Sequence, residues 1–166
     1  MRLAFAADSS TMKRKPLKPK RRRRILNEGR GTCGMSASID KVAWICIRDG
    51  RVLCARSKGK PAFYLPGGKR EHGETDADTL IREIEEELTV RIRRESIEYA
   101  GTYEAQAYGK PDGVTVRMAC YFAEHDGDVR PASEIDEIAW LAYEDRPRLS
   151  EAGRLVFDEL RASGRL

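Results

Sequence analysis

The chain has 166 residues and a formal net charge of +4, with 31 Lys/Arg against 27 Asp/Glu. This length favours one domain with a substantial core. The longest apolar run, residues 42–47, is far shorter than the ~20 residues that a transmembrane helix needs, so we expect no membrane partner. The apolar stretch 3–7 is also too short for a secretion signal, and basic residues follow it instead of preceding it.

The charge is distributed unevenly along the chain. Residues 1–34 carry 11 basic and 2 acidic residues, whereas the remainder carries 20 basic and 25 acidic residues. We therefore predict a basic, disordered extension over residues 1–35 and a folded domain over residues 36–166. The extension could bind nucleic acid through phosphates, although this is not the favoured interpretation, and a solvated tail is one alternative. Met35 precedes the first strand-like pattern, so translation that starts there would remove the extension altogether.

The four cysteines do not form a recognisable metal or disulfide pattern. Cys33, Cys46, Cys54 and Cys120 show no Cys-x-x-Cys spacing and no nearby histidines. The last three lie in apolar, strand-like runs, which predicts buried, reduced thiols. A cytosolic, hence cytoplasmic, location fits this usage.

The folded part begins with strand patterns. Residues 42–47 and 52–55 read as a hairpin, joined by a tight turn at Asp49-Gly50. A short third strand is predicted at residues 62–65, where Pro66-Gly67-Gly68 stops it.

A helix is predicted next, over about residues 75–88. Thr75 and Asp78 have the spacing of a capping box. Apolar residues then recur at helical spacing: Ala77, Leu80, Ile81, Ile84 and Leu88.

Further strands are expected near residues 97–107, 114–123 and 135–142, and a second helix near residues 150–162. In that helix Leu155, Val156 and Leu160 are expected on one apolar side, with Ser150 as N-cap and Gly164 as stop. This order of strands and helices favours an α/β or α+β fold around a mixed sheet.

The first helix carries an unusual concentration of carboxylates. Glu83, Glu86 and Glu87 stand at i, i+3 and i+4, so they share one face. Like charges at this spacing cost roughly 0.2–0.5 kcal/mol per pair, which a bound cation would relieve. Oxygen ligands without His or Cys suit Mg²⁺ or Mn²⁺ better than zinc. An acidic helix face on its own is more often just solvated.

The spacing of the neighbouring residues resembles the Nudix box, G-x5-E-x7-R-E-U-x-E-E-x-G-U, in which U is aliphatic. The matching run is Gly68, Glu74, Arg82-Glu83-Ile84, Glu86-Glu87 and Val90. Thr89 departs from the pattern, because the family has glycine there. Since a left-handed helix end costs a β-branched residue roughly 1–2 kcal/mol, we expect the helix to end differently.

The resemblance implies a mixed β-sheet sandwiched between α-helices, and a hydrolase that cuts a pyrophosphate linkage in a nucleoside diphosphate derivative. It implies Mg²⁺, with Mn²⁺ as an alternative, bound by Glu83, Glu86, Glu87 and a backbone carbonyl of Gly67 or Gly68. Glu74 and Arg82 would pair and hold the helix and loop in register. The general base would be Glu83 or Glu86 on the helix, or Glu134 in a later loop, where an ordinary exposed acid is the simpler interpretation.

Substrate contacts are less specific. Arg56 and Lys69 match family positions that contact phosphates, whereas Lys58 and Lys60 are expected to be solvated. Tyr64 is the candidate for stacking a nucleobase, with Tyr103, Tyr108 and Trp140 as further aromatics, although an aromatic residue in a strand more often packs in the core.

The compact domain most resembles the nucleoside triphosphate pyrophosphohydrolase group, which includes enzymes that clear oxidised nucleotides. Two alternatives stay open: a non-catalytic nucleotide-sensing or RNA-binding module, and a hydrolase of RNA caps or dinucleoside polyphosphates. A homodimer also stays open.

Overall fold

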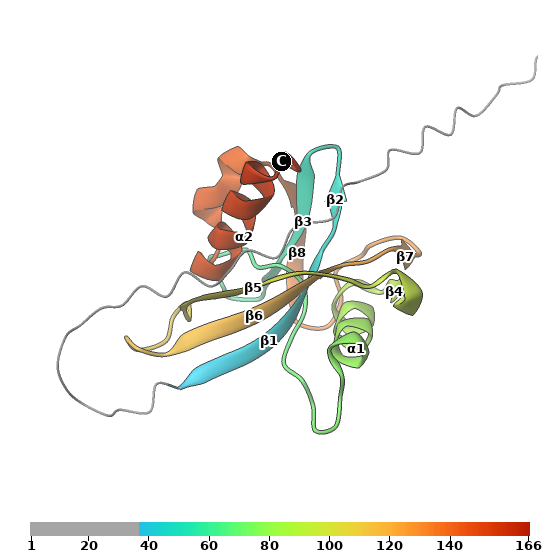
Figure 1. Ribbon diagram of the computed structural model, residues 1–166, viewed down its shortest axis with the longest axis horizontal. Coiled ribbons are helices and arrows are strands. Elements are labelled where there is room, and N and C mark those ends of the chain that lie inside the picture. The colour runs from blue at the N-terminus through green and yellow to red at the C-terminus, as the bar shows by residue number, and fades with distance from the viewer. Residues whose placement is uncertain (1–36) are drawn as a thin grey trace, which may run out of the picture. The chain divides into compact units, whose positions relative to one another are not determined.

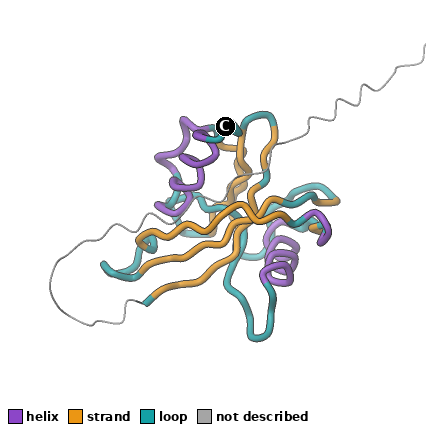
Figure 2. Tube along the Cα trace, viewed as in Figure 1, coloured by secondary structure: helices purple, strands orange, loops and turns teal. Residues whose placement is uncertain are grey.

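The computed structural model describes residues 37–166, which lie within one compact unit, Cys33–Leu166. The predicted basic extension and Cys33 lie outside the described residues. The strands are β1 (Ser38–Ile45), β2 (Ile47–Arg48), β3 (Arg51–Ser57), β4 (Arg91–Ile92), β5 (Glu98–Gln106), β6 (Thr115–Phe122), β7 (His125–Asp126) and β8 (Ile135–Leu141). The helices are α1 (Asp76–Leu88) and α2 (Glu151–Ala162), with short 3₁₀ turns η1 (Arg94–Ser96) and η2 (Tyr143–Arg148). Figure 2 shows the long loop that joins β3 to α1.

The strands form a mixed arrangement, as predicted. One sheet has the order β1-β6-β5, a second has the order β2-β3-β8, and β4 pairs with β7. The pairing of β1 with β6 is parallel, and the other pairings are antiparallel. The predicted first strand bends at Cys46 into β1 and β2, so it contributes to both larger sheets. Asp49 and Gly50 both have positive φ, as the tight turn between β2 and β3 requires.

The predicted third strand, 62–65, is reduced to isolated bridges. Tyr64 pairs with Ala55, and Phe63 pairs with Leu149. The segment then continues beside β1, where the Pro66 carbonyl accepts from the Trp44 N–H at 2.9 Å. Proline has no N–H to donate, so it interrupts a regular ladder at this point.

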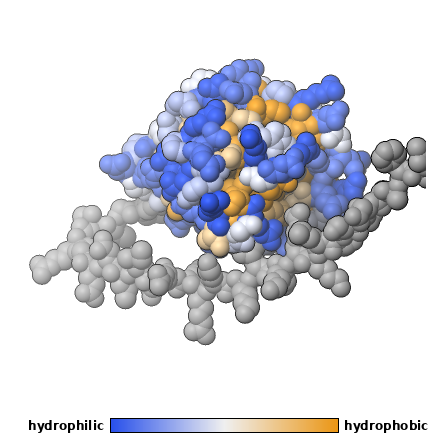
Figure 3. Space-filling view, turned by 90° about the horizontal axis from the view of Figure 1, so that it is seen from above, coloured by the Kyte–Doolittle hydropathy of each residue, from blue (hydrophilic) through white to orange (hydrophobic). Residues whose placement is uncertain are grey.

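Helices cover the sheets from two sides, which confirms the predicted sandwich (Figure 1). Alternation along β1 places Val42 and Trp44 in a core cluster with residues of α1. Ala43 and Ile45 belong instead to a second cluster with residues of α2. Burial on both faces explains why the second half of this strand, residues 42–45, is continuously apolar. On the surface, apolar residues gather across the middle of one face, within a largely hydrophilic surround (Figure 3).

Helix α1 begins as predicted and ends differently from the prediction. The Thr75 hydroxyl accepts from the Asp78 N–H, and the Asp78 carboxylate accepts from the Thr75 N–H, which completes the capping box. Thr89 nevertheless adopts the left-handed conformation, with φ of 60°, so the expectation of another kind of helix end is wrong. Residues 130 and 132 donate their N–H groups to the carbonyls of Leu88 and Glu87. These tertiary hydrogen bonds offset the backbone strain at Thr89.

Helix α2 has its predicted ends, because Ser150 caps it and Gly164 follows it with positive φ. The predicted apolar side was partly wrong: Leu155 is 40% exposed, whereas Val156 and Leu160 are buried.

Cys54 and Cys120 are buried free thiols, as expected, and burial raises the pKa of the half-buried Cys46 to about 11. No helix among residues 37–166 is long and apolar enough to cross a membrane.

Candidate active site

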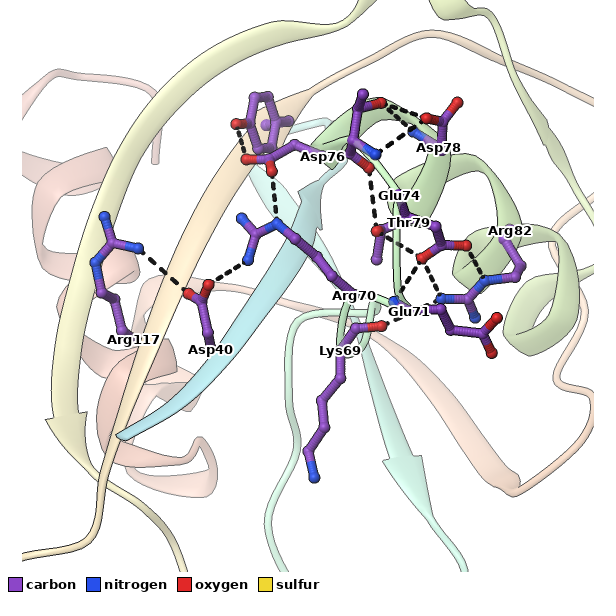
Figure 4. A network of polar contacts seen from close by, with 12 residues as sticks. Asp40, Lys69, Arg70, Glu71, Glu74, Asp76, Asp78, Thr79, Arg82 and Arg117 are labelled. Carbon is purple, nitrogen blue, oxygen red and sulfur yellow. Dashed lines mark hydrogen bonds and ion pairs between the residues drawn. The ribbon is translucent and has the colours of Figure 1, made fainter. Parts of the chain in front are cut away.

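An ion pair between Arg82 and Glu74 braces the loop before α1 against the helix. Arg82 donates to both carboxylate oxygens of Glu74, at 2.6 and 2.9 Å, and a further N–H of its guanidinium reaches the Lys69 carbonyl at 3.2 Å (Figure 4). Glu74 also accepts from the Thr79 hydroxyl and from the Glu71 N–H. These bonds, led by that from Arg82, lower the pKa of Glu74 to about 2. A two-oxygen pair of this kind fixes direction as well as distance.

The two glycines of the box allow chain segments to approach closely. A Cβ atom on Gly67, whose φ is +131°, would lie 2.3 Å from the Val42 carbonyl oxygen of β1. A Cβ atom on Gly68 would lie 2.2 Å from the Glu83 carboxylate. Gly67 also donates its N–H to a carboxylate oxygen of Glu87 at 2.9 Å. The loop backbone and the helix carboxylates therefore meet because neither glycine has a side chain.

The three helix carboxylates differ in their surroundings. Glu87 is only 7% exposed, and its pKa is raised to about 7, first by burial and then by the nearby charges of Glu83 and Glu134. Glu83 faces Gly68 and accepts from Arg82 at 3.0 Å. The Glu86 side chain is 57% exposed and lies 3.6 Å from Arg82. Within residues 37–166, no three His, Cys, Asp or Glu side chains converge closely enough to hold a metal ion as they stand.

The donor chemistry nevertheless fits a hard divalent cation. Glu83 and Glu87 offer carboxylate oxygens beside the backbone of Gly67 and Gly68. Glu87 is a buried carboxylate whose principal charged neighbours are also acidic, and such a group is costly without a cation. Oxygen donors of this kind suit Mg²⁺ or Mn²⁺.

A cavity of about 470 Å³ opens beside these groups, which is large enough for a small-molecule ligand. Seven of the predicted site residues line it: Tyr64, Gly67, Gly68, Lys69, Glu83, Glu87 and Glu134. Lys60, predicted to be solvated, lines it too, and so does Tyr108, whose ring meets Tyr64 edge-on with centroids 6.3 Å apart. Lys41 and Lys110 also line the cavity. The sequence does not predict this, because their positions depend on the packing of β1 and of the turn between β5 and β6.

Glu134 reaches the cavity wall from the loop before β8. It accepts from the Ser133 hydroxyl at 2.8 Å, which is the main reason that its pKa is lowered. Ser133 itself has a φ of 54°, a left-handed conformation that is uncommon for serine. An ionised carboxylate at this wall is suitably placed to accept a proton.

Arg56 does not line this cavity. Its guanidinium donates to Glu137 at 2.5 Å and lies 5.5 Å from the centre of the Phe63 ring. Arg56 is absent from the lining of the cavity, so the described arrangement does not bring it together with Lys69 and Tyr64.

Comparison with known proteins agrees with this fold. A model of the NUDIX domain matches residues 39–160, so the chain belongs to the Nudix family. A curated relative, the NAD-capped RNA hydrolase NudC of Pseudomonas putida, is 32% identical over 68% of this chain and 39% of that protein. A MutT-like protein of Streptomyces ambofaciens is 30% identical over 63% of this chain and 64% of that protein. The chain thus spans well under half of the NudC relative.

Among solved structures, the MutT NUDIX hydrolase of Burkholderia pseudomallei superimposes with a TM-score of 0.63 at 25% identity. That match covers 74% of this chain and 98% of the other. The α+β sandwich described above is therefore the Nudix fold.

Proposed function

We propose that this chain is a pyrophosphohydrolase that uses Mg²⁺ or Mn²⁺ to cleave a nucleoside triphosphate or another nucleoside diphosphate derivative. The observation that carries the proposal is the buried Glu87, held by the Gly67 N–H beside Glu83 at the wall of a ligand-sized cavity. By their printed names, one of the two curated relatives is an NAD-capped RNA hydrolase and the other is a MutT-like protein.

The proposed ligands of the metal ion are Glu83, Glu86 and Glu87, with a backbone carbonyl of Gly67 or Gly68. The Gly68 carbonyl already accepts from the Val42 N–H at 2.9 Å, which fixes its direction and leaves it a second lone pair. A bound divalent metal would neutralise phosphate oxygens and lower the pKa of a water molecule.

The other site residues have proposed roles around this centre. Glu74 and Arg82 hold the loop and helix in register, so that the carboxylates keep their direction relative to the glycines. Glu134 at the cavity wall is one proposed general base, and Glu83 or Glu86 is the other, a contribution typically worth 10²–10⁴-fold. Lys69 would bind phosphate and Tyr64 would stack the nucleobase. A role for Arg56 would require its release from Glu137.

The experiment is a cleavage assay of the full chain with Mg²⁺ or Mn²⁺. The substrates are nucleoside triphosphates, their oxidised forms, nucleotide sugars and dinucleoside polyphosphates, with products separated by chromatography. Glu87→Gln is the test variant, and Glu85→Gln is its matched control, because Glu85 is exposed on the same helix. Metal-dependent cleavage that Glu87→Gln abolishes and Glu85→Gln retains would support the proposal. A folded, metal-binding protein that cleaves nothing would favour a nucleotide-sensing module instead.

A second candidate substrate is capped RNA, which the name of the Pseudomonas putida relative favours. The basic run within residues 1–34 supplies charge for an RNA strand. Activity on capped RNA that falls steeply with rising salt would support it, since phosphate contacts release counterions. A salt-independent activity confined to free nucleotides would oppose it.

A further inference from the structure

The loop between Gly68 and Thr75 is held on two sides, and the Nudix box accounts for one of them. On that side Arg82 binds Glu74. On the other side Arg70 donates its Nε–H to Asp76 at 2.6 Å and an Nη1–H to Asp40 at 2.5 Å (Figure 4). Arg70 thus links the loop to the first residue of α1 and to strand β1 at once.

The two carboxylates that Arg70 binds are themselves fixed by strand β6. Asp76 accepts a hydrogen bond from the Tyr121 hydroxyl, and Asp40 pairs with Arg117 at 3.3 Å. The Arg70 side chain is only 23% exposed. An arginine that is bound at both ends and largely shielded orders its backbone more firmly than an isolated surface pair would.

Lys69, the residue next to Arg70, points in the opposite direction in Figure 4 and lines the cavity. Its carbonyl is held by Arg82, so its backbone is fixed from the helix side as well. Lys41, next to Asp40 on β1, lines the same cavity. Because successive residues of an extended segment point to opposite sides, fixing Arg70 and Asp40 on one side directs both lysines to the other.

We infer that Arg70 is a positioning residue, which uses Asp40 and Asp76 as anchors to hold Lys69 toward the phosphates of a bound nucleotide. Arg70 acts through Lys69 and does not touch the substrate. This inference rests on the proposed function and adds to it a device for substrate binding.

The test is a double-mutant cycle on the full chain with the nucleotide that the wild type cleaves. Arg70→Gln should raise KM about threefold to tenfold. Its kcat should change less than about twofold, because lost uniform binding appears in KM alone. Once Lys69→Ala has removed the lysine, adding Arg70→Gln should raise KM no further. Arg70→Lys should recover part of the affinity, since it keeps the charge and loses the two-anchor geometry.

The matched control is Arg93→Gln, which removes a guanidinium from Asp126 of β7 and lies outside both the loop and the lining of the cavity. It should leave KM close to that of the wild type. Equal increases in KM from Arg70→Gln with and without Lys69 would overturn the inference, and so would an unchanged KM. Should Arg70→Gln fail to fold, Asp40→Asn removes one anchor and enters the same cycle. A wild type that cleaves no nucleotide defeats the proposed function instead, so the two failures are distinguishable.

Discussion

Two glutamates of the Nudix box, Glu74 in the loop and Glu87 near the end of α1, lie in opposite surroundings. At the loop end, Glu74 is bound by Arg82, Thr79 and a backbone N–H, and these partners lower its pKa to about 2. At the cavity end, Glu87 is buried beside two other acids, and its pKa is raised to about 7. The comparison shows that the fold itself supplies the hydrogen bonds that stabilise the charge of Glu74, whereas it supplies too few for the charge of Glu87. The ion pair of Glu74 with Arg82 is here called the brace, because it holds the loop against α1. Glu87, in contrast, is a carboxylate that a bound cation would stabilise.

The largest effect is expected from removing the charge at the cavity end. Glu87→Gln should lower kcat by about 100-fold or more, because a metal ligand is lost. Glutamine can still accept from the Gly67 N–H, so the fold should persist. Without metal, the melting temperature should rise, because a buried charge beside Glu83 and Glu134 has been removed. Kinetics and thermal unfolding check both results, and wild-type turnover in this variant would refute the assignment.

The brace can be weakened without changing its charge. Arg82→Lys cannot bind both oxygens of Glu74 and the Lys69 carbonyl together, so we expect a loss of about 10–100-fold in kcat/KM. The control is Arg94→Lys, because Arg94 pairs with Asp78 on the exposed surface. It should retain nearly full activity in the same assay. Equal losses in the two variants would show that the brace has no special role.

The brace should also appear in the pH dependence of stability. The folded pKa of Glu74, about 2, lies below its ordinary value of 4.5, so the folded state binds fewer protons than the unfolded state between these values. The stabilisation is therefore present above about pH 4.5 and is lost as the pH falls toward 2. Denaturant unfolding should show that the free energy of unfolding of Glu74→Gln falls furthest below that of the wild type near neutral pH. A deficit that stays constant down to acidic pH would contradict this account.

The smallest effect is expected at the end of α1, behind both regions. Thr89→Gly should stabilise the protein by about 1 kcal/mol, because glycine adopts the left-handed conformation without the strain of a β-branched residue. Thr89→Ala should recover less, since it still has a Cβ atom. Catalysis should be unchanged in both. Denaturant unfolding is the measurement, and a destabilised Thr89→Gly would show that the threonine side chain makes a contact worth more than the strain.

Local signals in the sequence predicted the parts of the site that lie close together along the chain. The capping box of Thr75 and Asp78 depends on a spacing of three residues. The pairing of Glu74 with Arg82, eight residues apart, was implied by the resemblance to the Nudix box and is present in the structure. The strand at 62–65 was overestimated, because β-propensity says nothing about whether a ladder partner is available.

The anchors of Arg70 could not be predicted in this way. Arg70 and Asp40 are 30 residues apart, and Asp76 and Tyr121 are 45 apart. Their meeting depends on the parallel register of β1 and β6, which tertiary packing decides. The positions of Lys41 and Lys110 at the cavity wall also depend on tertiary packing, so the sequence did not predict them either.

The most direct test of the central claim is calorimetric titration of Mg²⁺ and Mn²⁺ into the full chain, without nucleotide. Wild type and Glu85→Gln are compared with Glu87→Gln. The account predicts saturable binding to the first two proteins and at least about tenfold weaker binding to Glu87→Gln. Equal binding to all three proteins would contradict it, because the buried carboxylate at the cavity would then not be the group that holds the cation.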